Sequence, residues 1–362
     1  MMLQDIKKAN IAEYVDDSSH GENLRSLRTI ALFGKNVATY KFALALALLK
    51  VKTNRSGINF EDLQVDFLNE FLLHYEEVPE QFSSGKPSRI TIACDRYIES
   101  GKTQSALLEL KDSTASQWHN YVFDAFHNVG GGSIAKKWWL FEHDNKGKSL
   151  VLTDRLLELR ENPLEKKIMI DEILARWSIV QSAWAAGVST NLVTYSKTEG
   201  LVISNQSGSG RRVSLRSALD ALLPYQKGRC FYCDAVVDKT SKNSDDLFPD
   251  VDHFFAHSYI AKLKENGDRR ALSINKDGIW NLVIACKACN RGAQGKFDSR
   301  PPVNFFEKLV KRNMLFTEEH KHAFRSGVLT TLGVSTSTQM QNKMNDLWSE
   351  FEIRKVWTPK GI

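Results

Sequence analysis

The 362-residue sequence contains no hydrophobic run long enough to cross a bilayer. Its most apolar stretch, residues 37–49, is too short for this and includes Lys41. The opening residues, MMLQDIKKANIAEYVDDSS, are polar and lack the apolar core of a signal peptide. Only five cysteines are present, and without an export signal they favour reduced thiols or metal ligation over disulfides. We therefore expect a cytoplasmic protein with no membrane insertion.

Internal repeats, low-complexity segments and a nucleotide-binding phosphate loop are also missing. Two short stretches, SGKT at 100–103 and GKS at 147–149, match only the last residues of a phosphate loop. The first glycine of that motif should stand five residues before the glycine that precedes the lysine. Arg96 and Glu142 stand at these two positions instead. These absences exclude a solenoid and a P-loop nucleotide site.

The chain has only a slight excess of positive charge, with a formal net charge of +6. Its distribution is uneven, because residues 200–325 hold 21 Lys and Arg against 14 Asp and Glu. The rest of the chain holds 28 against 29. A basic segment of this kind favours an anionic partner, most simply nucleic acid. The alternative is a basic face that only meets solvent.

Helical periodicity dominates the first 190 residues, and residues 37–49 are apolar nearly all round, as in a helix at the centre of a core. Apolar residues also recur at helical spacing in 59–75 and 165–186, whereas GGG in 129–133 indicates a loop.

Beyond residue 190 two short β-type runs, 191–195 and 200–204, precede an expected helix at 214–225. Three further helices are expected after Pro301-Pro302, at 304–312, 318–330 and 338–351.

Four of the five cysteines form two C-x2-C pairs, which predict a closed zinc site. The pairs are Cys230 with Cys233 and Cys286 with Cys289. Such loops let thiolates reach one tetrahedral ion at about 2.3 Å, and four thiolates leave no open position, so this zinc would be structural. Cys94 is expected to be a core thiol.

Between the two cysteine pairs lie 52 residues, far more than a simple two-knuckle zinc site needs. This interval contains an adjacent Asp252-His253 pair in DVDHFFAHS and Asn281 in GIWNLVIACKACN. Asn290 follows the second cysteine pair directly, and Lys296 comes soon after.

These elements, in this order, resemble the zinc-knuckled HNH endonucleases of the ββα-metal (His-Me finger) fold. The resemblance covers residues 227–301, which would form the nuclease domain of an α+β chain. A mostly helical N-terminal domain is expected over 1–190 and a β-type linker with a lead-in helix over 191–226. A helical C-terminal segment is expected over 302–362.

The stretch LFGKNVATYKFALALALL at 32–49 resembles bacterial HNH proteins with a helical domain before the nuclease. Some of these belong to phage-defence systems such as type II Zorya, so other defence subunits are possible partners.

The resemblance also implies a role for each residue. Asp252 and Asn290 would hold a catalytic Mg²⁺ or Mn²⁺, and His253, on the other face of the strand, would take a proton from the attacking water. Asn281 would brace the loop or orient His253. The predicted reaction is hydrolysis of DNA phosphodiester bonds to a 5′ phosphate and a 3′ hydroxyl. The family often has proline where Ala256 stands, which puts the local turn in doubt.

Several interpretations stay open from the sequence. Arg291, Lys296 and Arg300 fit phosphate contacts, although each also fits a solvated helix start. His257 suits either packing or a substrate-facing position. The main alternative function is a catalytically silent zinc module that binds nucleic acid or a protein partner, and it differs from a nuclease in not needing the Asp-His-Asn set.

Overall fold

A computed structural model describes residues 22–34, 37–52, 57–83, 86–129, 132–144, 148–185, 191–196, 200–205, 213–214, 218–238, 240–318, 324–351 and 355–359. They fall into two compact units of mixed helix and strand, a first unit within Ile11–Val188 and a second unit within Ser189–Ile362. Among the described residues, none of the helices combines the length and apolar character that a bilayer crossing requires.

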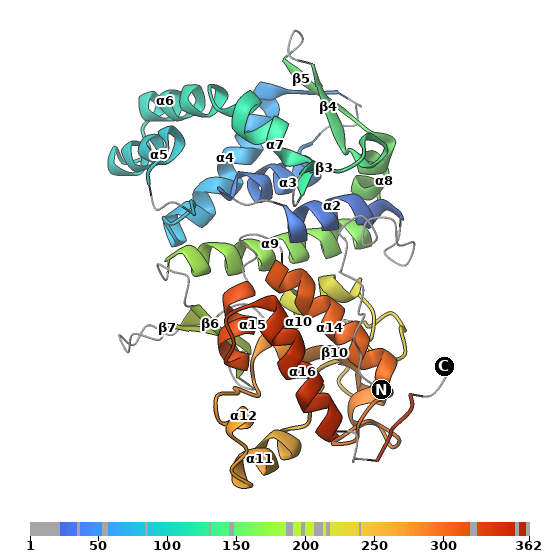
Figure 1. Ribbon diagram of the computed structural model, residues 1–362. Helices are drawn as coiled ribbons and strands as arrows, with labels where there is room; N and C mark the ends of the chain where they lie inside the picture. Colours follow the sequence, from blue (N-terminus) through green and yellow to red (C-terminus); the bar gives the residue numbers. More distant parts are fainter. Residues whose placement is uncertain are drawn as a thin grey trace. The chain divides into compact units, whose positions relative to one another are not determined.

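The first unit is built around helix α3 (Tyr40–Lys50), which is buried from Tyr40 to Leu49. It packs against α4 (Phe60–Glu77) and α9 (Pro163–Ala185), and α2 (Glu22–Phe33) also packs on α9 (Figure 1). A buried ion pair joins these last two helices, with Arg28 Nη2 2.7 Å from Glu172 Oε1. Because burying an unpaired charge is costly, this pair fixes which faces of the two helices meet.

Smaller elements complete the first unit. Three further helices are α5 (Arg89–Glu99), α6 (Gln104–Ala115) and α8 (Asp154–Glu161). Between them lie a π-helical turn (Trp118–Phe123) and the short α7 (Asp124–Phe126). An antiparallel sheet has the order β1 (Gly57–Asn59), β5 (Ser149–Leu152), β4 (Phe141–Asp144). The expected loop at 129–133 instead begins and ends in paired strands, β2 (Asn128–Val129) and β3 (Gly132–Ser133), with 130–131 outside the described residues.

The second unit opens with an antiparallel sheet, β6 (Asn191–Ser196), β7 (Gly200–Asn205) and β8 (Val213–Ser214). The prediction of a helix over 214–225 is wrong at its start, because Ser214 pairs with Val202 in this sheet. Residues 215–217 lie outside the described residues, and the helical part is α10 (Ala218–Leu222) with a 3₁₀ turn, Leu223–Gln226.

A two-stranded antiparallel hairpin forms the centre of the second unit. Strand β9 (Pro249–His253) pairs with β10 (Leu282–Cys286), with Leu282 opposite His253 and Cys286 opposite Pro249. Every residue of β10 is buried. Helices α11 (His257–Glu265) and α12 (Arg269–Leu272) lie in the connection between the strands, and α13 (Lys287–Arg291) follows β10 at once.

Three C-terminal helices pack together beside this hairpin: α14 (Val303–Glu318), α15 (Arg325–Leu332) and α16 (Ser337–Phe351) (Figure 1). The middle prediction, 318–330, is corrected because Glu318 ends α14, while 319–323 lie outside the described residues. The buried Arg312 of α14 donates to the carbonyl oxygens of Leu282 and Ile279, and burial lowers its pKa to about 9. Helix α14 thereby holds the backbone at the start of β10.

Candidate functional site

The four paired cysteines converge at one end of the hairpin. Cys230 and Cys233 lie in the turn after the 3₁₀ segment, Cys286 ends β10, and Cys289 lies in α13. Their sulfur atoms all lie within 4.8 Å of one another, and Cys233 Sγ is 3.7 Å from Cys286 Sγ. Tetrahedral zinc with bonds of about 2.3 Å requires sulfurs about 3.8 Å apart. The cluster therefore fits a zinc ion.

The surroundings shift the pKa values of the four thiols in different directions. The backbone N–H groups of Tyr232 and Cys286 donate to Cys230 Sγ at 3.4 and 3.3 Å. Hydrogen bonds from Cys230 and Cys289 lower the pKa of the Cys286 thiol to about 4, whereas hydrogen bonds with Cys230 raise the pKa of the Cys233 and Cys289 thiols. Outside the cluster, burial raises the pKa of Cys94 in α5 to about 12, so this core thiol stays protonated.

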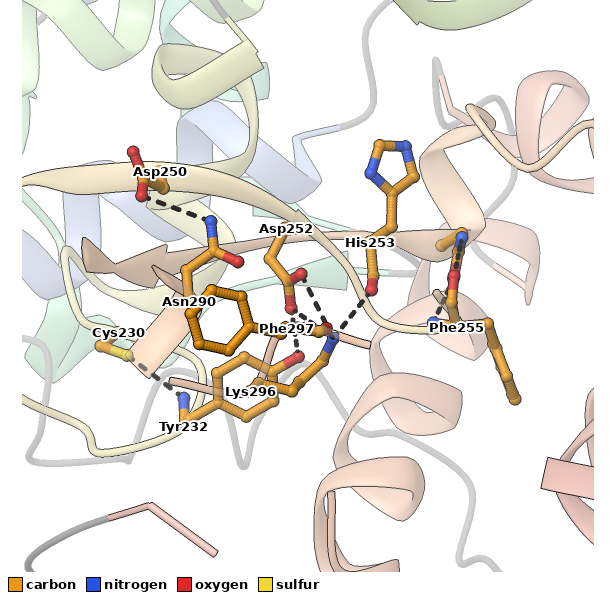
Figure 2. Close-up of polar contacts among 10 residues, drawn as sticks. Cys230, Tyr232, Asp250, Asp252, His253, Phe255, Asn290, Lys296 and Phe297 are labelled. Carbon is orange, nitrogen blue, oxygen red and sulfur yellow. Dashed lines mark hydrogen bonds and ion pairs between the residues drawn. The ribbon is translucent and has the colours of Figure 1, made fainter. Parts of the chain in front are cut away.

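Asp252 lies on the buried face of β9, 6% exposed. The Tyr232 hydroxyl donates to its Oδ2 at 2.6 Å, and Lys296 Nζ lies 3.2 and 3.3 Å from its two carboxylate oxygens (Figure 2). The Lys296 side chain is fully buried and also donates to the carbonyl oxygens of His253 and Phe297, both at 3.1 Å. The predicted phosphate contact of Lys296 is therefore corrected, because this ammonium is an internal cation that reaches no surface ligand.

Asn290 is placed near Asp252 by the turn of α13. Its Nδ2 donates to Asp250 Oδ2 at 3.3 Å, and its amide oxygen points toward the Asp252 carboxylate (Figure 2). In this arrangement Asp252 and Asn290 do not fit as ligands of an oxygen-ligated Mg²⁺ or Mn²⁺. Both Asp252 oxygens already bind donors, and the Lys296 ammonium neutralises the charge that would attract the ion.

His253, the last residue of β9, points its ring to the opposite side of the strand from Lys296 (Figure 2). Its Nε2 lies 3.0 Å from Asp277 Oδ1, and its side chain is 13% exposed. Alternation along a strand explains why adjacent residues enter two different environments. Asp252 is buried beside Lys296. His253 reaches solvent beside the Asp277 carboxylate.

Asn281 holds the backbone just after His253 and just before Asp277. Its Oδ1 accepts from the Phe255 N–H at 2.8 Å, while its Nδ2 donates to the carbonyl oxygens of Phe255 and Lys276, both at 3.0 Å. The side chain is fully buried. One amide therefore ties the segment after His253 to the turn that carries Asp277.

Asp277 is a residue of the candidate site that the sequence analysis did not identify. Its Oδ1 also lies 3.1 Å from His257 Nε2, where His257 begins α11. Partial burial acts to raise the Asp277 pKa, but the hydrogen bond from His253 and the charges of His253, His257 and Lys276 hold it below its ordinary value. The stretch NKDG at 275–278 carried only the signal of a polar turn.

Glycine is required at the next position of that turn. A Cβ on Gly278 would overlap the side chain of Thr331 in α15, so only glycine lets the turn approach this helix. The Asp277 N–H also donates to Asn275 Oδ1 at 3.0 Å. These contacts fix where the Asp277 carboxylate stands.

The two remaining predicted phosphate contacts lie in different surroundings. Arg291 is 44% exposed and pairs with Asp250, with Nε 2.7 Å from Oδ2, and it also donates to Asn243. Arg300 stacks its guanidinium over the Trp348 ring at 4.6 Å. Between them in sequence, Phe297 is 56% exposed and has a left-handed backbone, with φ 46°. An exposed aromatic ring in that conformation is unusual and marks a candidate contact surface.

Comparison with known proteins adds no assignment. No family model matches the chain, and no curated protein or solved structure resembles it closely enough to count as a match.

Proposed function

We propose that the second unit is an HNH-type endonuclease that hydrolyses phosphodiester bonds in DNA. The observation that carries the proposal is the hydrogen bond between His253 and Asp277, at 3.0 Å, at the solvent-reaching end of a hairpin whose other end carries the four cysteines. In this proposal zinc fixes the hairpin and α13, and His253 performs the chemistry.

His253 acts as the general base. When Nε2–H donates to Asp277, the lone pair lies on Nδ1, which takes the proton from the attacking water. Asp277 orients the ring and stabilises the imidazolium that forms, while Asn281 holds both segments in register. A positioned base of this kind contributes about 10²–10⁴-fold to the rate.

The basic excess of residues 200–325 supports nucleic acid as the substrate. The half-exposed Arg291 can contact phosphate, although it must share its guanidinium with Asp250. The exposed ring of Phe297 can stack on a base, and such stacking is worth about 1–3 kcal/mol per base. Contacts of this kind discriminate weakly between sequences.

A catalytic Mg²⁺ or Mn²⁺ stays a prediction without assigned ligands, because Asp252 already binds Tyr232 and Lys296, and the roles above are assigned to protein groups alone. A direct test incubates the purified protein with supercoiled plasmid in Mg²⁺, Mn²⁺ or EDTA and follows nicked and linear products. We expect cleavage in at least one divalent ion. Absence of cleavage under every condition, by a folded protein that holds zinc, would contradict the proposal.

A second function, a silent zinc module that binds nucleic acid, is favoured by the neutralised Asp252 carboxylate. The two proposals differ in one result of the same assay. A silent module retards the plasmid with an affinity that falls steeply with salt, because counterions are released, but leaves it supercoiled. Nicked or linear plasmid that depends on His253 excludes this alternative.

A further inference from the structure

We propose that His253, His257 and Asp277 form a second metal site, which takes a transition-metal ion such as Zn²⁺ and switches off the proposed base. The metal-binding part stands on geometry alone. The inhibitory part rests on the proposed function, because it needs His253 to be the proton acceptor. We call these three residues the His–Asp–His cluster.

The cluster already brings three ligand atoms to one point. Asp277 Oδ1 lies 3.0 Å from His253 Nε2 and 3.1 Å from His257 Nε2, and the three residues each offer one ligand atom within 4.8 Å of the others. Ligands on tetrahedral zinc at about 2.0–2.1 Å stand about 3.3 Å apart. The two measured distances therefore need to change by only a few tenths of an ångström.

The two imidazoles approach from different directions, as ligands of one ion must. Their ring centroids are 3.9 Å apart with an interplanar angle of 76°. The side chains of His253, His257 and Asp277 are 13, 38 and 32% exposed, which places the cluster near the surface, and the His257 Nε2 atom itself is buried beneath it. Three protein ligands leave a fourth position for water, as in open zinc sites.

A single residue holds the ligand-bearing segments in place. Asn281 accepts from the Phe255 N–H, between the two histidines, and donates to the Lys276 carbonyl oxygen, beside Asp277. A site whose ligands are fixed before the ion arrives loses little conformational entropy on binding. Because Asn281 holds both segments, the three side chains differ from surface residues that are close together only by chance.

The ligand types select the ion. Two imidazole nitrogens and one carboxylate oxygen favour zinc, nickel or copper over magnesium. The Asp252 face of the strand offers no comparable opening, because Tyr232 and Lys296 already bind its carboxylate. A transition-metal ion therefore meets its best donors on the His253 face.

Binding there changes the chemistry of His253. Neutral imidazole carries one proton, and an ion on Nε2 requires that proton to move to Nδ1 through solvent, with no net proton released. Nδ1 is the nitrogen that accepts the proton of water in the proposed mechanism. With the ion on Nε2, Nδ1 carries the proton and has no lone pair left to accept another. The ion therefore removes the base.

The metal content tests the site without any assay of cleavage. Wild type, His257→Ala and Asp277→Asn are dialysed against micromolar Zn²⁺, then against zinc-free buffer containing a weak chelator, and zinc and protein are measured. We expect wild type to bind a second zinc beyond that of the four cysteines, and both variants to bind it at least about tenfold more weakly, since even outer-sphere partners of a metal are worth about 10–100-fold. His143→Ala is the matched control, because His143 Nε2 also lies 3.0 Å from a carboxylate oxygen, that of Asp124, but belongs to no group of three possible metal ligands among the described residues. It should bind zinc as wild type does.

Wild type that takes up only the zinc of its four cysteines would overturn the site, and so would undiminished second binding in His257→Ala. The inhibitory part is tested by adding Zn²⁺ to the plasmid assay and expressing inhibition relative to each variant's own zinc-free rate. We expect zinc to inhibit wild type and to inhibit His257→Ala at least about tenfold less readily. Equal inhibition of both would contradict the switch. A second zinc on dialysis, together with no cleavage by the protein before any zinc is added, would refute the proposed function and leave the metal site standing.

Discussion

Asp252 and His253 are neighbours in sequence, yet the strand sends them to environments that differ in almost every physical respect. Asp252 is 6% exposed and neutralised by Lys296, which is itself fully buried. His253 reaches solvent and pairs with Asp277. Asp252 therefore belongs to the internal support of the hairpin, and His253 belongs to the face on which we propose the reaction.

Removing the Lys296 ammonium should destabilise the second unit strongly. Lys296→Met leaves the Asp252 carboxylate buried with only the Tyr232 hydroxyl as a donor. Breaking a buried pair in this way typically costs about 3–5 kcal/mol. Urea unfolding monitored by tryptophan fluorescence measures the loss.

The double variant Asp252→Asn with Lys296→Met is the control, because it removes both charges. We expect it to recover much of the stability lost in Lys296→Met. A Lys296→Met protein within about 1 kcal/mol of wild type would show that the pair contributes little, as exposed ion pairs do.

At the level of single residues, the sequence identified more than it could arrange. The cysteine spacing predicted the four-sulfur cluster, which the structure contains. It could not reveal that Lys296 turns inward, because a lysine near a helix start is exposed in most proteins. Asp277 was missed for a related reason, since its pairing with His253 depends on a turn placed by Asn281 and by the close approach of Gly278 to α15.

Among the elements, the four cysteines connect the turn after the 3₁₀ segment, the end of β10 and the start of α13. These pieces are short, since β10 and α13 have five residues each. Elements of this length are marginal by themselves, so the metal would supply much of their order. Asn290, next to Cys289, is placed by the same turn.

Cys286→Ser should therefore release zinc and lower the melting temperature of the second unit. A structural zinc site contributes its binding energy to folding, so the loss should amount to several kcal/mol. Elemental analysis and thermal unfolding measure both effects. Cys94→Ala is the matched control, because it removes a fully buried thiol that lies outside the cluster.

The control should lose some stability through its cavity but keep its zinc. If Cys286→Ser kept its zinc and its melting temperature, the four sulfur atoms would not be acting as one site.

Helix α3 offers a test of the first unit. Burial lowers the pKa of Lys41 to about 7, and its Nζ donates to the Asn128 carbonyl oxygen at 2.5 Å. In the unfolded chain the pKa of lysine is about 10.4. Between these values the unfolded state binds more protons, so the Lys41 contribution to stability rises with pH from about 7 to about 10.4.

Lys41→Met should remove this dependence. The stability of the variant relative to wild type should therefore fall by on the order of 3 kcal/mol between pH 7 and pH 10. Urea midpoints across that range measure the difference. A difference that stays constant with pH would mean that the Lys41 ammonium is not desolvated.

Long periodic elements were predictable, whereas short ones were predicted only in part. The helices expected at 37–49, 59–75 and 165–186 appear as α3, α4 and α9, because their apolar faces determine their type, although α3 begins only at Tyr40. The β-type runs at 191–195 and 200–204 appear as β6 and β7. Ser214 was wrongly placed in a helix, since its pairing with Val202 is a long-range contact. The small sheets of the first unit were missed for the same reason.

For the whole molecule, composition gives a partner class and no more. The positive excess lies within residues 200–325, in the unit that also carries the four-cysteine cluster and the His–Asp–His cluster. That coincidence supports a nucleic-acid substrate. Membership of a phage-defence system, and any partner subunit, rest on residues 32–49 alone and stay predictions.

The central claim is that His253 takes a proton during phosphodiester hydrolysis, and one comparison tests it most directly. Plasmid cleavage is measured for wild type, His253→Ala and the control His143→Ala, which loses a similar histidine–carboxylate pair in the first unit. Melting temperature, zinc content and DNA affinity are recorded for each. We expect His253→Ala to cleave about 10²–10⁴-fold more slowly while keeping its fold, its zinc and its affinity. A folded His253→Ala protein that cleaves at the wild-type rate would contradict the account.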